Sequence, residues 1–518
     1  MLPSIADFLF VILFIYLALP KGGIKLLQDA DTGYHVRAGE YILTKHLIPK
    51  YDLFSFHYPN LPWTAHEWLS EVVMAIVHGT FGMTGLVIFF AMLIAGFYCL
   101  LFRVLLKYSN NIILPLVAVL LAIASSQVHW LARPHIFSFF FVLLWYFCLD
   151  YHQHGIEKFI WALPFAMLFW VNLHGGFMAG FILLGAFLVG NIIQAISSDG
   201  EARHKAKKRC CQLINITALC IAACLINPFG YHILLFPFNL VGNKFLMDHV
   251  SEFISPNFHE PFIFKYHLLF LIALLALTRE RARGSDLLLI LGFTSMSLYS
   301  SRHIPLFAIV TAPVLVRQGD LLLNSCKCRL ADFVRDRGKL FFDIAYRAIP
   351  LIWPFVVVAA VAYYAANGKI EHRFDATIKP VAATAFLLRE PLKGNMFNND
   401  EFGDYIIYAA WPKYRVFFDG RSDMYGVSLM KDYFKVTDVE TGWEKVLDSY
   451  HIEWIIFDAN SVLSRVLLEN KDWRLIYADK LANIFVRNTS CNRALISRYS
   501  NVRPVPQEKN EIIAERTI

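Results

Sequence analysis

Apolar runs recur throughout the first 366 residues and limit what this chain can fold into more than any other feature. A membrane-spanning α-helix needs roughly 17 to 25 apolar residues, and the longer runs reach this length. About eleven spans are predicted, at 3–19, 84–106, 112–128, 136–150, 159–172, 177–197, 214–226, 266–278, 286–300, 303–316 and 350–366. Hydrophobic residues make up 57% of the chain and charged residues only 17%, which excludes an ordinary soluble protein. The sequence predicts a polytopic α-helical membrane protein.

Two apolar segments, at 231–241 and at the first span, differ from the other predicted spans. Residues 231–241 are short and interrupted by proline, which favours a re-entrant or interfacial piece over a full span. The first span lacks a basic flank and a small-residue cleavage site, so we expect it to be retained as a helix.

Basic residues predict the orientation, because Lys and Arg near span ends stay on the cytoplasmic side. With a cytoplasmic N-terminus, the inner loops receive the basic stretches 201–209, 279–283 and 317–347. Residues 20–83 and everything after 367 then lie outside, in a periplasm-like compartment of a prokaryotic inner membrane. The net charge of +7 is therefore mainly a topology signal, and nucleic acid is not an expected partner.

The nine cysteines contain no C-x-x-C pair and no disulfide framework. Cys326 and Cys328 lie in a predicted inner loop, and a zinc site there would need two further ligands nearby.

Three domains are expected. Residues 1–366 form the membrane domain, with long outer loops at 20–83 and 227–265. Residues 367–490 form a periplasmic α/β domain, and residues 491–518 form a loose polar tail.

Alternating short apolar runs and amphipathic runs support the α/β domain. Strands are predicted at 395–398, 414–420, 453–459, 473–479 and 483–488, and helices at 401–411, 428–434, 441–450 and 461–470. The first outer loop carries helical periodicity at 32–46 and 66–82, which predicts two amphipathic helices along the membrane surface.

Asp29 and Asp31 stand two positions apart just outside the first span. On a continuing helix they would point in nearly opposite directions, so we expect both in a loop, where they can face one site. Such a pair suits a general base with an orienting partner, or the binding of a hard divalent cation. An ordinary solvated pair is the commoner interpretation of these two residues alone.

Other polar residues lie at the outer ends of the predicted spans or in the outer loops. They are His66, Glu67, Arg133, His135, Asn172, His174, Asn227, Glu252, Arg302 and His303. Each alone is explained by snorkelling or by an interfacial hydrogen bond. Together they predict a cavity at the bilayer surface that suits a substrate with an anionic head and a long hydrocarbon tail.

The motifs "DADTGYHVRAGEYIL", "PWTAHEWLSEV", "RPHIF", "NLHGGF", "SRHIPLF" and "YRVFFDGRSDMYG" resemble those of prokaryotic membrane proteins in the GT-C glycosyltransferase superfamily. In layout the chain is similar to protein mannosyltransferases, aminoarabinose transferases and oligosaccharyltransferase catalytic subunits. The resemblance implies a polyprenyl-phosphate-linked sugar donor and an acidic motif in the first outer loop. That motif falls on Asp29 and Asp31, where relatives often have adjacent Asp-Glu.

A mechanism follows as an expectation. Arg133 and Arg302, with the neighbouring histidines, would hold the leaving phosphate as its charge grows. Asp31 would take the proton from an acceptor hydroxyl, and Asp29 or Glu252 would orient it or share a metal. A single displacement inverts the anomeric centre. Mn²⁺ or Mg²⁺ bound by Asp29 and Asp31 stays open, as do the sugar and the glycan, lipid or protein acceptor.

Two alternatives remain. A transporter or flippase of lipid-linked sugars would also need apolar spans with cationic mouths, although transporters usually bind near the membrane midplane. An O-antigen polymerase or ligase would share the lipid-linked donor and differ in the acceptor.

Overall fold

The computed structural model describes residues 3–57, 61–260, 262–280, 282–347 and 352–506. These residues form two compact units. The helical unit comprises Met1–Gly23, Thr84–Gly242 and Met247–Glu371, and the mixed unit comprises Ile24–Met83, Asn243–Leu246 and His372–Ile518. The first outer loop therefore lies in the same unit as the C-terminal residues.

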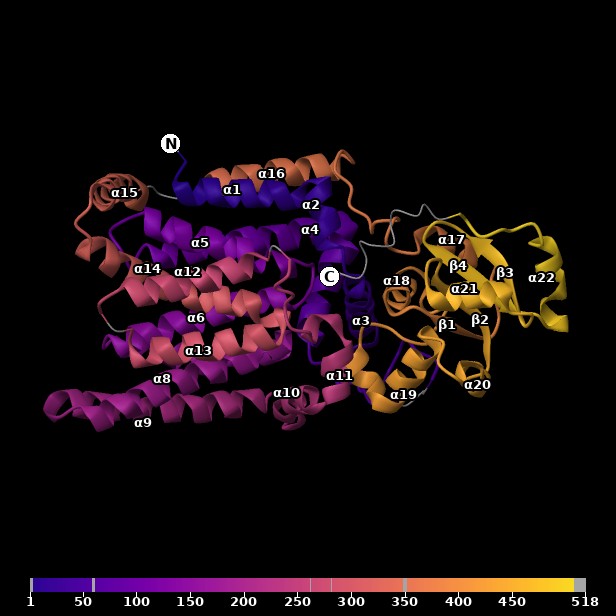
Figure 1. Cartoon of the computed structure of the whole chain (residues 1–518), viewed down its shortest axis with the longest axis horizontal. Helices are drawn as coiled ribbons and strands as arrows, with labels where there is room; N and C mark the ends of the chain where they lie inside the picture. Colours follow the sequence, from indigo (N-terminus) through magenta and orange to yellow (C-terminus); the bar gives the residue numbers. More distant parts are fainter. Residues whose placement is uncertain (1–2, 58–60, 261, 281, 348–351, 507–518) are drawn as a thin grey trace. The chain divides into compact units, whose positions relative to one another are not determined.

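The helical unit is a bundle (Figure 1). Its helices are α1 (Ile5–Ala18), the later part of α4 (Trp68–Leu105), α5 (Ile113–Ser126), α6 (His135–Gln153), α7 (Leu163–Leu173), α8 (Met178–Ser197), α9 (Gly200–Cys224), α10 (His232–Gly242), α12 (Ile263–Leu277), α13 (Gly284–Tyr299), α14 (Ile304–Ser325), α15 (Arg329–Arg347) and α16 (Ile352–Ala366). α14 packs against α5, α6, α12 and α13, and its side chains are buried almost without interruption from Ile304 to Gly319. This apolar helix is the centre of the unit's core.

Every predicted span coincides with a helix, but the number of spans is not confirmed. Among the described residues, four helices are long and apolar enough to cross a membrane: Trp68–Leu105, His135–Gln153, Gly175–Ser197 and Ser301–Ser325. A fifth is obtained if Ile5–Ala18 and α2 (Pro20–Leu26), bent by 79° relative to each other, form one span. The other apolar helices are shorter, and α9 extends the predicted 214–226 run by a strongly basic first half.

Polar side chains collect at the two ends of this bundle. At one end, Arg317 binds Asp286 at 2.8 Å and Arg283 binds Asp150 at 3.1 Å. At the other end, where α13 finishes and α6 and α14 begin, lie Arg133 and the 300–303 segment. The bundle thus separates the basic stretches assigned to the inner loops from the residues assigned to the outer surface.

The mixed unit contains a four-stranded sheet of order β1-β2-β4-β3. Its strands are β1 (Asn395–Asn398), β2 (Ile452–Asp458), β3 (Trp473–Ala478) and β4 (Ala482–Arg487). β1 pairs with β2 in parallel, and the other two pairings are antiparallel. The central strands β2 and β4 are almost wholly buried, because helices pack on the sheet.

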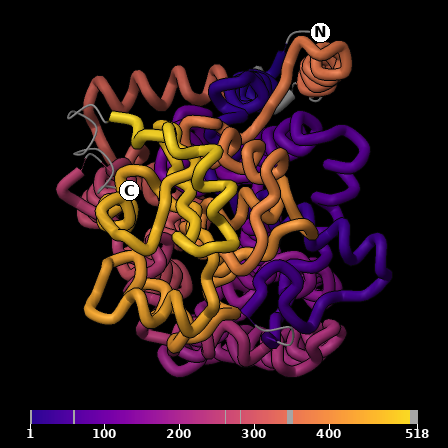
Figure 2. Tube along the Cα trace, turned by 90° about the vertical axis from the view of Figure 1, so that its right-hand side faces the viewer, coloured from indigo at the N-terminus to yellow at the C-terminus, as the bar shows by residue number. Residues whose placement is uncertain are grey.

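The helices of the mixed unit are α3 (Asp31–Lys45), the first part of α4, α17 (Val381–Arg389), α18 (Asp400–Ala410), α19 (Ser422–Thr437), α20 (Trp443–Ser449), α21 (Val462–Glu469) and α22 (Arg493–Arg498), and α11 (Lys244–His249) begins in it. α17 packs against β3 and β4, so the orange and yellow parts of the C-terminal segment lie side by side (Figure 2). Four of the five predicted strands and all four predicted helices are present.

One predicted strand is wrong. Residues 414–420 form no strand of the sheet, and Val416 makes a single parallel bridge to Ser55 in the first outer loop. The Val416 amide donates to the Phe54 carbonyl at 2.9 Å, and the Phe56 amide donates to the Val416 carbonyl at 3.3 Å. The segment is extended because it pairs with a distant loop.

The two helices predicted in the first outer loop are present as α3 and the start of α4. α4 continues to Leu105 through a break at Gly82, whose φ of 65° and ψ of −169° are open to glycine. This break lies beside the boundary between the two units at Met83 and Thr84.

The C-terminal tail is partly ordered. Residues 493–498 form α22, and the ring of Tyr499 lies 5.3 Å from that of Phe386. Residues 507–518 of the predicted tail lie outside the described residues. The domain boundaries drawn from the sequence stay predictions.

Candidate active site

The acidic pair occupies the turn between α2 and α3. Asp29 lies in the turn and Asp31 is the first residue of α3, so the expectation that both lie in a loop is correct only for Asp29. The Asp31 amide donates to Asp29 Oδ1 at 2.8 Å, as is usual where an Asx turn leads into a helix. Asp31 is only 7% exposed, and the helix N-terminus favours its negative charge. The two carboxylates therefore have different local roles.

α18 brings a third carboxyl group to Asp31. α3 and α18 cross closely at Gly33, where an added Cβ would lie 2.7 Å from Tyr408 Cβ and 3.0 Å from the Asp404 carbonyl oxygen. The crossing is held by the Arg37 Nε, which donates to the Tyr408 carbonyl at 2.8 Å. Asp404 was not among the residues that the sequence predicted for the site.

Gly420 lies against both carboxyl groups. Its amide donates to Asp404 Oδ1 and Oδ2 at 3.1 Å each. A Cβ at Gly420 would lie 2.2 Å from Asp31 Oδ1 and 3.1 Å from Asp404 Oδ2. Burial, together with the carboxylates of Asp31, Asp419 and Asp29, raises the pKa of Asp404 well above its usual range. Asp404 therefore favours its neutral form.

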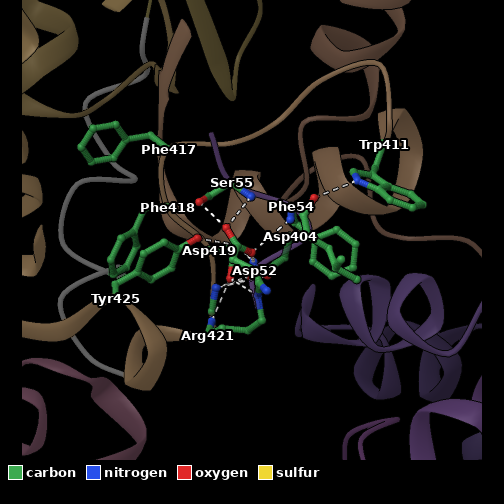
Figure 3. A network of polar contacts seen from close by, with 12 residues as sticks. Asp52, Phe54, Ser55, Asp404, Trp411, Phe417, Phe418, Asp419, Arg421 and Tyr425 are labelled. Atoms are coloured by element: carbon green, nitrogen blue, oxygen red, sulfur yellow. Dashed lines mark hydrogen bonds and ion pairs between the residues drawn. The ribbon is translucent and has the colours of Figure 1, made fainter. Parts of the chain in front are cut away.

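The 419–421 turn is fixed by a buried ion cluster (Figure 3). Arg421 Nη2 lies 2.6 Å from Asp419 Oδ2 and 2.8 Å from Asp52 Oδ1. The Tyr425 hydroxyl also donates to Asp419 at 2.6 Å. Burial opposes ionisation of Asp52, but Arg421 and hydrogen bonds from Ser55 and Phe54 lower its pKa overall. The cluster joins the first outer loop to the C-terminal segment.

Aromatic rings enclose the same guanidinium group. Its central carbon lies 4.8 Å from the ring centre of Phe54 and 4.7 Å from that of Trp63. Trp411 Nε1 donates to the Leu53 carbonyl at 3.2 Å on the neighbouring side (Figure 3). These cation–π contacts strengthen in a site that excludes water.

The predicted residues His66 and Glu67 form part of a chain of ionisable groups. Glu67 Oε1 lies 3.7 Å from His66 Nε2, and Glu67 Oε2 lies 3.6 Å from His35 Nε2. His35 Nδ1 lies 3.3 Å from Glu71 Oε1. His35 and Glu71 were not among the predicted site residues; they meet because Gly39 of α3 lies directly on the Glu71 carbonyl of α4.

The helical unit holds the predicted cations. Arg133 Nη1 lies 2.5 Å from Glu252 Oε1, and Arg302 Nη1 lies 3.8 Å from Glu252 Oε2. Burial opposes ionisation of Glu252, but the two arginines lower its pKa well below its usual range. Glu252 was expected beside the acidic pair as an orienting group or metal ligand; in this unit it is the counter-ion of the arginines.

The predicted histidines make specific hydrogen bonds to the backbone. His135 Nε2 donates to the His129 carbonyl at 2.7 Å, and His303 Nδ1 donates to the Met296 carbonyl at 3.2 Å. His174 Nδ1 accepts from the Gly176 amide at 2.9 Å, so it carries no proton there. His174 is therefore neutral in this arrangement, whereas the sequence analysis counted it among the cations.

Asn172 joins two loops of the helical unit. Its Nδ2 donates to the Leu168 carbonyl at 2.8 Å, and its Oδ1 accepts from Asn227 Nδ2 at 3.0 Å. This bond ties the 172–176 segment to the start of the second outer loop.

A metal site is not preformed among the described residues, where no group of three His, Cys, Asp or Glu side chains is arranged to hold an ion. Asp29 and Asp31 offer two carboxylates, and one oxygen of Asp29 accepts the Asp31 amide. Mn²⁺ or Mg²⁺ would need its remaining ligands from water or substrate.

No known protein-family model and no curated protein matches this sequence. Solved structures do match the fold. The archaeal oligosaccharyltransferase AglB from Archaeoglobus fulgidus, in complex with an inhibitory peptide and a dolichol-phosphate, is 12% identical with a TM-score of 0.53, over 88% of this chain and 69% of that chain.

Two further structures of the Archaeoglobus fulgidus oligosaccharyltransferase agree. The apo form has a TM-score of 0.51 at 12% identity, over 94% of this chain and 74% of that chain. The form tethered to an acceptor peptide with the NVT sequon has a TM-score of 0.52 at 12% identity, over 88% and 68%. The chain thus has a fold similar to that of an oligosaccharyltransferase, which agrees with the predicted resemblance.

Proposed function

We propose that this protein is a membrane glycosyltransferase that moves a sugar from a polyprenyl-phosphate-linked donor to an acceptor hydroxyl on the periplasmic face. The observation that carries the proposal is the buried Asp31 at the start of α3, in a chain with the fold of an oligosaccharyltransferase. The dolichol-phosphate and the acceptor peptide named in the neighbouring structures support a lipid-phosphate donor and a separate acceptor.

Asp31 is the general base in this proposal. Its carboxylate accepts the proton of the acceptor hydroxyl while the oxygen attacks the anomeric carbon, and the bond from that carbon to the phosphate oxygen breaks. The leaving phosphate takes the bonding electron pair, and the anomeric configuration inverts. Asp29 is better placed to orient Asp31 than to replace it, because it already accepts the Asp31 amide.

Arg133 and Arg302 act on the phosphate, whose charge grows as the sugar leaves. Glu252 cancels one of their two charges, so the pair supplies less net charge than two isolated arginines. His66 and Glu67 of the mixed unit, and His135, Asn172, His174 and His303 of the helical unit, remain predicted substrate contacts. Mn²⁺ or Mg²⁺ held by Asp29 and Asp31 would supply further positive charge to the phosphate.

Purified protein and a panel of synthetic polyprenyl-phosphate-linked sugars test the proposal, with release of polyprenyl phosphate as a readout that needs no knowledge of the acceptor. Asp31→Asn is expected to lower the rate about 100-fold or more. Asp400→Asn, a change of the same kind on α18 away from this turn, keeps wild-type turnover. Full activity of correctly folded Asp31→Asn protein would refute the role of Asp31 as base.

A further inference from the structure

We infer that Gly420 is a positioning residue for Asp31: the bare backbone of the Asp419-Gly420-Arg421 turn sets where the Asp31 carboxylate lies. The inference rests on the proposed function, since it assigns Gly420 a role through the proposed base. It concerns a residue 389 positions further along the chain than Asp31.

The space beside Asp31 explains the glycine. A Cβ at Gly420 would lie 2.2 Å from Asp31 Oδ1, closer than a real Cβ approaches another atom, and 3.0 Å from Asp31 Cγ. The φ of Gly420 lies outside the left-handed region, so its backbone conformation does not demand glycine. Glycine is therefore required at position 420 because any side chain would occupy the space of the Asp31 carboxylate.

The turn is held firmly enough to position a neighbour. The Gly420 amide is anchored on the Asp404 carboxyl group, and the flanking Arg421 is anchored on Asp52 and Asp419. Asp404, Asp419 and Arg421 are each no more than 2% exposed. A turn fixed from both sides cannot yield to an added methyl group, so the Asp31 side chain has to rotate instead.

The turn of the C-terminal segment is also joined to the first outer loop, which carries Asp31. Asp52 binds Arg421 from the first outer loop, and the Phe54 carbonyl accepts the Val416 amide in the same region. The segment that carries the proposed base and the segment that positions it thus belong to one compact unit.

Gly420→Ala in the full-length purified protein is the direct test. Displacement of a reacting group by about 1 Å costs on the order of 100-fold in rate, so we expect kcat to fall about 100-fold. The KM for the polyprenyl-phosphate-linked sugar and the Kd for polyprenyl phosphate alone are expected to change less than about twofold, because the methyl group displaces the base and removes no phosphate contact.

Gly79→Ala is the matched control. Gly79 is a glycine of the same unit, in the first part of α4, and nothing lies within 4 Å of its added Cβ, so kcat and KM are expected to stay at wild-type values. A rise in the Kd for polyprenyl phosphate, or a fall in thermal stability, that is equal in both variants would indicate a general effect of the substitution and overturn the inference.

A double substitution separates positioning from general damage. In the Asp31→Asn background, Gly420→Ala should lower the residual rate by less than about twofold, because the group it displaces no longer acts. An undiminished further loss of about 100-fold would overturn the inference. If Gly420→Ala does not fold, Asp419→Asn replaces it in the same cycle, because it loosens the contact that holds Arg421. Asp419→Asn alone is expected to lower kcat about tenfold. If its effect on the rate simply added to that of Asp31→Asn, the positioning role would again be wrong.

Failure of the proposed function and failure of the positioning role give different results. If Asp31→Asn is fully active, the proposed function fails whatever Gly420→Ala does. If Asp31→Asn is inactive but Gly420→Ala retains wild-type kcat, only the positioning role is wrong.

Discussion

Asp31 and Asp404 lie on helices far apart in the sequence, yet both carboxyl groups contact the same glycine. The charge in "DADTGYH" made Asp31 a candidate from the sequence alone, because two carboxylates directly after an apolar run are unusual. Asp404 and Gly420 carried no comparable signal, since their importance depends on the crossing of α3 and α18. Local patterns reveal an unusual residue, but they do not reveal its partners.

At residue level, Asp404 is expected to act as a neutral acid. Since burial and its acidic neighbours raise its pKa, Asp404→Asn replaces the protonated form with a close isostere that can still accept the Gly420 amide. Stability is expected to stay within about 0.5 kcal/mol of wild type or to rise, whereas Asp404→Ala loses about 1–3 kcal/mol with its hydrogen bonds. Thermal unfolding in detergent checks this, and a large loss in Asp404→Asn would show that the charged form is required.

Asp400 gives a pH dependence with a defined sign. Burial and the neighbouring Glu401 carboxylate raise its pKa to about 6, from about 3.9 in an unfolded chain. The folded state thus holds the proton more tightly, so this contribution to stability is full below about pH 4 and is lost as the pH rises to about 6. Asp400→Asn is expected to be more stable than wild type by about 3 kcal/mol at about pH 7.5 and equal to it below about pH 4. Unfolding curves across this range test it, and a difference independent of pH would contradict the assignment.

At the level of elements, the period of the hydrophobic pattern identified nearly every helix and strand. β1 to β4 fall where alternating apolar residues placed them, and α18 to α21 fall on the amphipathic runs. The predicted strand at 414–420 failed because "YRVFF" is apolar for another reason: it packs against Phe54 and Phe56 of the first outer loop. Pairing with a loop some 360 residues away leaves no local sequence signal.

The ion cluster that joins these segments should carry much of their mutual stability. Arg421→Ala leaves the buried carboxylates of Asp52 and Asp419 without their cation, which typically costs about 3–5 kcal/mol. Arg415→Ala, an exposed arginine of the same segment, is expected to change stability by less than about 0.5 kcal/mol. Limited proteolysis and thermal unfolding compare the two variants. Equal effects would show that the cluster does not stabilise the contact between the two segments.

The arginine pair of the helical unit makes its own prediction. Arg302→Gln is expected to weaken binding of polyprenyl phosphate about tenfold, because a charged hydrogen bond to an anion is worth about 1.5–3 kcal/mol. Lys265→Gln, on α12, serves as the cation control. Calorimetric titration of both variants with polyprenyl phosphate provides the measurement, and unchanged affinity in Arg302→Gln would remove Arg302 from the donor site.

For the whole molecule, the apolar pattern identified a helical membrane protein with a C-terminal α/β part, and the fold agrees. The number of spans could not be read from the sequence, because several apolar helices are shorter than a bilayer requires. The grouping of the first outer loop with the C-terminal residues was also beyond sequence patterns, since it follows from buried contacts such as that between Asp52 and Arg421. These contacts place the proposed base in a well-packed environment.

We propose above that this protein breaks the bond between a sugar and a lipid phosphate while Asp31 takes the proton of the acceptor hydroxyl. The most direct measurement follows a polyprenyl-phosphate-linked sugar and an acceptor mixture on purified wild-type and Asp31→Asn protein, with release of polyprenyl phosphate and the anomeric configuration of the product as readouts. We expect an inverted glycoside from the wild type and at least about a 100-fold slower reaction from Asp31→Asn. Equal rates from the two proteins, or passage of the intact donor across a proteoliposome membrane without bond cleavage, would contradict the proposal.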